Sequence, residues 1–352
     1  MKRNKKDTKG VMILIGLLII IVLVFFIGIY TDKKNSSSNQ KMAEEYNQKM
    51  YEELFKKAEN DRRIKESLPR IICWGDSLTA GVGGNGVTYP NVLADLIKLK
   101  VINLGVGGEE TKEIAIRQGA ISVYTNELVI PKDIQDVEIS LYHEQGESVK
   151  LGIQGDSGLN PCEINGVVGE ITYNSADDKM YFRRKTQGSE VTVENGTQLI
   201  TEGMKNKNSN DILVIFTGSN DNIDVYNVQN IIDIQRQMIE YSGNEKYIII
   251  GLTSKDYMSG IEDINNILME EYGENFIDIK KYILENGLAD VGIQATDQDK
   301  IDIENGKIPS SLRVDSIHGN SYFYRVVGQQ VYNKIIQLGY INDEQKEYLG
   351  IN

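Results

Sequence analysis

Apolar residues along this 352-residue chain form short continuous runs that alternate with longer helix-like stretches. Runs such as Ile212–Phe216 and Ile248–Ile250 are typical of strands buried on both faces. The stretches between such runs carry apolar positions three and four residues apart, as amphipathic helices do. This alternation predicts an α/β fold with a parallel sheet covered by helices on both faces. The expected strands are 70–74, 100–104, 212–217, 246–252 and 275–279, and the expected helices are 88–98, 110–118, 226–241, 259–271 and 320–337.

A segment with a different pattern of apolar and polar residues interrupts this alternation between residues 119 and 203. Apolar and polar residues alternate there in short stretches that are separated by glycine, asparagine and aspartate turns, a pattern typical of antiparallel strands. The segment is too long for a loop of a compact domain, so we expect an inserted β-subdomain. It could cover the active-site edge or pack to one side. The candidate strands are 137–141, 149–153, 169–173 and 191–193.

The N-terminal part of the chain has three sections. Residues 1–10 are basic, and residues 11–30 carry no charge and are long enough to form a transmembrane helix. A cleaved signal peptide would have a shorter apolar region that ends in small residues. We therefore expect a single-pass cell-membrane protein with a cytoplasmic N-terminus and an extracellular C-terminal domain. Residues 31–68 predict a polar linker and an amphipathic helix, 41–67, which could be a stalk, a short coiled coil or, as we favour, a helix packed on the domain.

Charge and residue usage exclude several classes of function. The net charge of -13 and the absence of a basic stripe argue against nucleic-acid binding. The two cysteines, Cys73 and Cys162, are too few for a disulfide framework. The two histidines, His143 and His318, are not accompanied by cysteines at zinc-ligand spacing, so we expect neither a metal nor a cofactor.

The strongest chemical signal is Gly75-Asp76-Ser77-Leu78, which directly follows the first predicted strand. Ligands of open α/β sheets bind at the C-terminal ends of the strands, where the next helix points its N–H groups. A nucleophilic serine fits that edge. The alternative is that Asp76 and Ser77 only cap the next helix, as both residue types commonly do.

Three further blocks follow in the order that a known family uses. Together with the first block they resemble the GDSL/SGNH hydrolase family of serine esterases and lipases. The resemblance covers residues 69–118 and 205–340, and it departs from the usual pattern at Gly107, Glu109 and Gly319. The three blocks are Asn103–Gly108, Gly218–Asp221 and Asp315–His318.

The resemblance implies a three-layer, flavodoxin-like α/β/α domain formed by residues 69–118 and 204–352, with residues 119–203 inserted. It also implies an oxyanion hole, a set of N–H donors that stabilise the developing oxyanion. By the family pattern these donors are the backbone N–H groups of Ser77 and Gly108 and the side-chain amide of Asn220.

A serine hydroxyl needs a neighbouring base, and that base needs a group that orients it. His318 is the realistic base, because His143 falls in a β-like part of the insert. Asp315 lies three residues before His318 and can reach its Nδ1 atom. These residues predict a catalytic triad of Ser77, Asp315 and His318. A second serine motif, Gly155-Asp156-Ser157-Gly158, resembles the serine block of chymotrypsin-like proteases, but we interpret it as a turn between strands because histidine and aspartate are not suitably placed before it.

The sequence therefore predicts a membrane-anchored, extracellular serine esterase. An O-acetyl group on a cell-envelope glycan is the first choice of substrate, since an exported and tethered enzyme meets such esters. A lipase or lysophospholipase is the second. A non-catalytic glycan- or protein-binding module and an acyltransferase remain alternatives.

Overall fold

The computed structural model describes residues 16, 18–24, 37–144, 146–253 and 260–351. The chain divides into two compact units, Met1–Glu66 and Ser67–Asn352. The helix predicted at 41–67 is present as α2 (Ser37–Ser67). Among the residues so described, no helix has the length and apolar character needed to cross a membrane. Most of the predicted transmembrane segment 11–30 lies outside the described residues, so that expectation stays a prediction.

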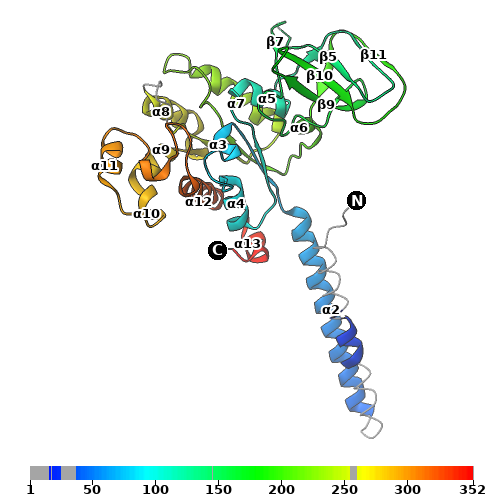
Figure 1. Cartoon of the computed structure of the whole chain (residues 1–352). Coiled ribbons are helices and arrows are strands. Elements are labelled where there is room, and N and C mark those ends of the chain that lie inside the picture. Colours follow the sequence, from blue (N-terminus) through cyan, green and yellow to red (C-terminus); the bar gives the residue numbers. More distant parts are fainter. Residues whose placement is uncertain (1–15, 17, 25–36, 145, 254–259, 352) are drawn as a thin grey trace. The chain divides into compact units, whose positions relative to one another are not determined.

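The second unit is built on a five-stranded parallel sheet, which confirms the predicted sheet (Figure 1). Its strand order is β2-β1-β13-β14-β15, with β1 paired in parallel to both β2 and β13. The order of the strands reverses between β1 and β13, and such a switch point opens a crevice at the C-terminal strand ends. The strands are β1 (Ile71–Gly75), β2 (Val101–Gly105), β13 (Ile212–Phe216), β14 (Tyr247–Ile250) and β15 (Phe276–Ile277).

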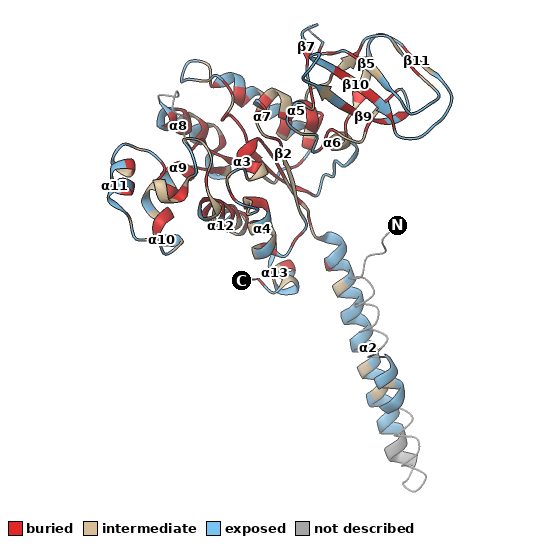
Figure 2. Ribbon diagram, in the orientation of Figure 1, coloured by how far each residue is buried: buried red, intermediate tan, exposed pale blue. Residues whose placement is uncertain are grey.

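Helices cover both faces of this sheet because alternate strand residues point to opposite sides. On one face Val214 belongs to a buried cluster with Leu93 of α4 and Val327 of α12. On the other, Ile215 packs in a cluster with residues of α5, α7 and α8. In Figure 2 most of this sheet is buried, whereas the edge strand β2 is intermediate. The helices are α4 (Tyr89–Ile97), α12 (Ser321–Gln337), α5 (Thr111–Gln118), α7 (Gln229–Ser242) and α8 (Ile261–Tyr272).

The connection between β15 and α12 contains helices that the sequence pattern did not predict. They are short and, in the case of the last one, strongly acidic, so they show no apolar stripe of helical period. This connection matters because it leads into the block that contains His318. The helices are α9 (Ile279–Tyr282), the π-helix η2 (Ile283–Gly287), α10 (Leu288–Asp290) and α11 (Asp297–Glu304).

The interrupting segment forms antiparallel strands between Tyr124 and Ile200, most of them in an eight-stranded sheet ordered β5-β10-β9-β8-β12-β3-β6-β7. This sheet has a hydrophobic cluster of its own, which includes Phe182 and Leu199. The strands of the sheet are β3 (Tyr124–Thr125), β5 (Asp136–Ile139), β6 (Leu141–Tyr142), β7 (Ser148–Val149), β8 (Cys162–Ile164), β9 (Val167–Asn174), β10 (Lys179–Arg184) and β12 (Thr197–Ile200), and β4 (Leu128–Ile130) pairs separately with β11 (Val191–Val193).

One predicted strand of the insert is wrong in extent. The alternating residues 149–153 predict a strand, but β7 ends at Val149. After it the chain leaves the sheet and packs on the α/β core, so Gly155 lies against Val106. We call residues 150–161 the insert loop.

The two ends of the insert lie side by side. A Cβ atom at Gly119, where the insert begins, would collide with the side chain of Met204, where it ends, and would come within 2.7 Å of Tyr241 Oη. Gly119 has φ +100°, in the left-handed region that glycine tolerates best. Between these ends, Thr201 Oγ1 donates to the carbonyl oxygen of Arg117 at 2.8 Å.

Candidate active site

Ser77 lies directly after strand β1, at the first residue of the short helix α3 (Ser77–Ala80). Asp76 caps that helix, because its Oδ1 accepts the N–H of Leu78 at 2.8 Å. Burial raises the pKa of the Asp76 carboxyl to about 6, and the Leu78 N–H opposes that shift. The helix turns tightly over the strand, since a Cβ at Gly75 would lie 2.9 Å from Thr79 Cβ. Helix capping was the alternative interpretation of Asp76 and Ser77. The cap is present, and it occurs together with the hydrogen bond of Ser77 described next.

The structure brings Ser77, His318 and Asp315 into one hydrogen-bonded chain. Nε2 of His318 lies 3.0 Å from Ser77 Oγ, and Nδ1 of His318 lies 2.8 Å from Asp315 Oδ2. The other oxygen of Asp315 accepts the backbone N–H of Ile317 at 2.8 Å and that of His318 at 2.6 Å. Burial raises the pKa of the Asp315 carboxyl, but these hydrogen bonds outweigh it, so the pKa falls below its ordinary value. A carboxylate is thus held ionised beside the imidazole.

Helix α11 anchors the loop that carries Asp315 and His318. Asp299 on this helix accepts the N–H of Ser311 at 2.8 Å and the hydroxyl of Ser311 at 2.7 Å. Burial raises the pKa of Asp299, but its hydrogen bonds with Thr296 and Ser311 outweigh the effect and lower it to about 2. The carbonyl of Ser311 in turn accepts Nδ2 of Asn320 at 2.8 Å, just beyond His318.

The predicted oxyanion residues come from two loops that bind each other. Gly108 has φ +75°, and Asn220 Nδ2 donates to the carbonyl oxygen of the next residue, Glu109, at 2.9 Å. A second link joins the same loops, because Asp221 Oδ2 accepts the N–H of Thr111 at 3.0 Å and its hydroxyl at 2.9 Å. The Asn220 amide is therefore held beside the glycine loop.

A buried ion pair lies behind this glycine loop. Arg117 Nε donates to Glu109 Oε2 at 2.7 Å, and the Arg117 side chain has no exposed surface. Burial raises the pKa of the Glu109 carboxyl, and the guanidinium of Arg117 opposes that shift. The same guanidinium lies 5.3 Å from the ring centre of Trp74 and donates to the carbonyl oxygens of Leu104 and Ser157. Arg117 thus connects the core, the glycine loop and the insert.

These groups comprise a hydroxyl, an imidazole, a carboxylate and a glycine loop at one sheet edge. No protein-family model matches this chain, and no curated protein is similar to it. A serine next to an oriented imidazole can act as a nucleophile toward a carbonyl carbon.

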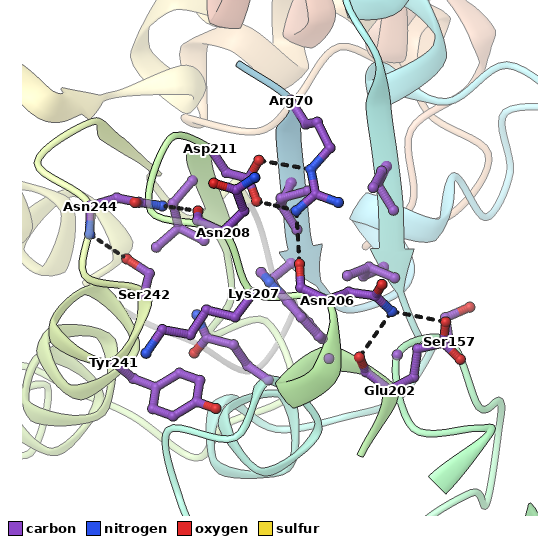
Figure 3. Close-up of a pocket in the computed structure, with 18 of the residues that line it drawn as sticks. Arg70, Ser157, Glu202, Asn206, Lys207, Asn208, Asp211, Tyr241, Ser242 and Asn244 are labelled. Carbon is purple, nitrogen blue, oxygen red and sulfur yellow. Dashed lines mark hydrogen bonds and ion pairs between the residues drawn. The ribbon is translucent and has the colours of Figure 1, made fainter. Parts of the chain in front are cut away.

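A separate cavity of about 380 Å³ lies on one face of the sheet (Figure 3). Its floor contains apolar strand residues, and its rim includes the paired side chains of Arg70 and Asp211, whose atoms approach to 2.6 Å. Ser157 and Gly158 of the insert loop form part of its wall. Neither Ser77 nor any other predicted site residue lines it, so this cavity and the candidate active site are distinct.

The remaining candidates from the sequence lie elsewhere. His143 is buried in the insert, where its Nε2 lies 3.4 Å from Glu147 Oε2. Cys73 and Cys162 are both buried and free, and burial raises the pKa of each thiol to about 12. Ser157 lies in a turn of the insert loop, where Leu159 N–H donates to Asp156 O at 2.9 Å.

Sequence reasoning missed Arg117 and Asp299. Arg117 sits in the last turn of a helix, a position where basic residues are commonly exposed. The one available signal was Glu109, which departs from the family pattern and pairs with Arg117 eight residues later. Asp299 is the third residue after Thr296 and forms a capping box with it, but this local pattern does not indicate the bonds to Ser311.

Proposed function

We propose that this chain is a serine esterase of the SGNH hydrolase family and that it cleaves esters through an acyl-enzyme. The observation that carries the proposal is the chain of hydrogen bonds from Ser77 Oγ to His318 Nε2, at 3.0 Å, and from His318 Nδ1 to Asp315 Oδ2, at 2.8 Å. Ser77 and His318 are 241 positions apart, so only the fold joins them. The flavodoxin-like strand order supports the same family assignment.

In the proposed reaction, Ser77 Oγ attacks the ester carbonyl carbon while His318 Nε2 takes the hydroxyl proton. The carbonyl oxygen becomes an oxyanion. When the tetrahedral intermediate collapses, the carbon–oxygen bond to the alcohol breaks and His318 returns its proton to the departing alcohol. Water then attacks the acyl-serine by the same route and releases the acid. Asp315 holds the imidazole in the required tautomer and stabilises its protonated form.

The oxyanion is stabilised by the N–H groups of Ser77 and Gly108 and by the amide of Asn220. An amide nitrogen carries two N–H groups. One of those on Asn220 already donates to Glu109 O at 2.9 Å, which orients the second. Donors of this kind are effective because they are aligned before the charge develops.

An O-acetyl group on a cell-envelope glycan is the proposed substrate. This choice follows from the predicted membrane anchor at residues 11–30 and from the expected extracellular position of the domain. The distinct cavity on the sheet face is not lined by Ser77 and so adds no acyl-chain pocket to the proposed site.

The direct test is hydrolysis of 4-nitrophenyl acetate by the purified full-length chain, with a chelator control. Ser77→Ala and His318→Ala should each lower kcat by at least about a thousandfold, since the triad acts as a unit. Two matched controls come from the other serine motif and the other histidine. Ser157→Ala and His143→Ala should keep wild-type turnover.

A folded wild-type chain that shows no more turnover than Ser77→Ala on acetyl and longer acyl esters would refute the esterase. The non-catalytic binding module would then be the better hypothesis. Transfer of the acetyl group to an added alcohol, with little release of acetate, would identify an acyltransferase instead.

A further inference from the structure

The insert loop reaches the candidate active site. It is fixed at two points, because Ser157 O accepts a hydrogen bond from Arg117 of the core and Gly158 O accepts the N–H of Gly203, the last residue of the insert, at 2.7 Å. Gly155 packs so closely on the core that a Cβ there would lie 3.2 Å from Val106 Cγ1. The residue before Gly155 is therefore held next to the glycine loop of the site.

That residue is Gln154, and its carboxamide lies directly over Gly108. A Cβ at Gly108 would come within 2.6 Å of Gln154 Cδ and Oε1. A Cβ at Gly107 would lie 3.4 Å from Gln154 Oε1 and 3.7 Å from Ser77 Cβ. The carboxamide and the nucleophilic serine thus flank the same glycine.

The Gln154 carboxamide is open to a ligand. Its side chain is exposed, and it makes no hydrogen bond with any other residue that the structure describes. A carboxamide offers two N–H donors and an acceptor oxygen, which together match the hydroxyl groups of a sugar. An acetyl group has only its carbonyl oxygen to offer, and in the proposed reaction the oxyanion donors bind that atom. A hydrogen bond from Gln154 therefore falls on the alcohol part of the ester.

We propose that Gln154 is a specificity-determining residue through which the insert recognises a hydroxyl-bearing alcohol, such as a sugar ring, next to the scissile ester. The proposal rests on the esterase function for the identity of the bond that is cleaved. It assigns the inserted subdomain a direct part in substrate binding, in addition to any role as scaffold.

The experiment compares two acetyl esters on the full-length chain, 6-O-acetyl-N-acetylglucosamine and 4-nitrophenyl acetate. Gln154→Ala should raise KM for the sugar ester about fivefold to tenfold with kcat unchanged, as the loss of one hydrogen bond made equally to substrate and transition state would do. Turnover of the aryl ester should not change. Gln187→Ala is the matched control, because Gln187 is an exposed glutamine of the insert whose Nε2 bonds Asp133 at 3.2 Å.

Two results would overturn the proposal while leaving the esterase intact. An unchanged KM for the sugar ester would show that the carboxamide does not contact substrate. An equal loss on both esters would show that Gln154 only supports the glycine loop.

A binding measurement separates this inference from the proposed chemistry. Calorimetric titration of Ser77→Ala with 6-O-acetyl-N-acetylglucosamine should show binding that weakens about fivefold to tenfold when Gln154→Ala is added. If wild type and Ser77→Ala hydrolyse both esters equally poorly, the esterase fails, yet a Gln154-dependent affinity would still support sugar recognition. Equal affinity with and without Gln154 would overturn the recognition proposal whatever the activity.

Discussion

The inner strands of the parallel sheet are buried on both faces, whereas the longest strand of the inserted sheet, β9, buries one face and exposes the other. All five residues of β13 are buried, but β9 alternates buried and exposed residues along most of its length. A substitution in an inner core strand therefore disturbs packing on one of two helix layers, while about every second residue of β9 faces solvent. The comparison indicates that core strand residues are constrained by packing on both faces, whereas the outward-facing residues of the insert are not.

The largest expected effect is at Arg117, where the two regions meet. Arg117→Met should lower the free energy of unfolding by about 3–5 kcal/mol, because it leaves the buried Glu109 carboxylate without its partner. Urea unfolding measures the loss. The emission of Trp74, the single tryptophan of the chain, should change as well, since the guanidinium lies against its ring.

Adding Glu109→Gln to that variant should restore part of the stability, because the uncompensated charge is then removed. A loss below about 1 kcal/mol for Arg117→Met alone would mean that the ion pair does not hold the two regions together.

The next largest effect is on kcat, and it concerns a residue of the core. Asn220→Ala should lower kcat by about 100- to 1000-fold, or about 2.7–4 kcal/mol of barrier, through loss of one oxyanion donor. Steady-state kinetics on 4-nitrophenyl acetate measures it. Asn222→Ala is the control, because Asn222 is exposed and lies two residues further along the same loop. Similar activities for the two variants would remove Asn220 from the oxyanion hole.

A smaller effect tests how firmly the core holds the loop that carries Asp315 and His318. Asp299→Asn should cost about 1–3 kcal/mol near pH 7 through weakened charge-assisted hydrogen bonds to Ser311. The pKa of Asp299 is about 2 in the folded chain, below its ordinary value of 3.8. Its contribution to stability is therefore full above about pH 4 and is lost as the pH falls toward 2.

Urea titrations at pH 7 and pH 3 should therefore give a smaller gap between wild type and Asp299→Asn at the lower pH. A gap that stays constant or widens on acidification would contradict the lowered pKa of Asp299.

The smallest effect concerns the exposed surface of the insert. Arg183 donates two hydrogen bonds to Asp136, both at 2.7 Å, but the two side chains are about half exposed. A double-mutant cycle with alanine at both positions should give only a weak coupling, well below the loss expected for Arg117→Met, and this coupling should shrink in high salt. Esterase activity should not change. A coupling as large as the loss of unfolding free energy expected for Arg117→Met would contradict the contrast between the buried and the exposed ion pair.

Local sequence pattern predicted the parallel sheet well because each core strand is a short apolar run, as in Ile212–Phe216, that ends at a turn. It failed for residues 149–153, where alternation suits a strand but the chain instead leaves the sheet to pack on Val106. The serine, histidine and aspartate were recognisable because each lies in a short motif. Gln154 and Arg117 were not, since their roles depend on contacts between the insert and the core, which no local pattern records.

Because Gly119 and Met204 lie in contact, the two ends of the insert meet, and the insert can be exchanged as one unit. A segment whose ends meet can be removed or exchanged by recombination without stretching the framework that it leaves behind. The residues of the insert can then be replaced as a block, while the proposed nucleophile, base and oxyanion donors are kept. Adjacent ends therefore allow recognition and chemistry to evolve at separate rates within a single gene.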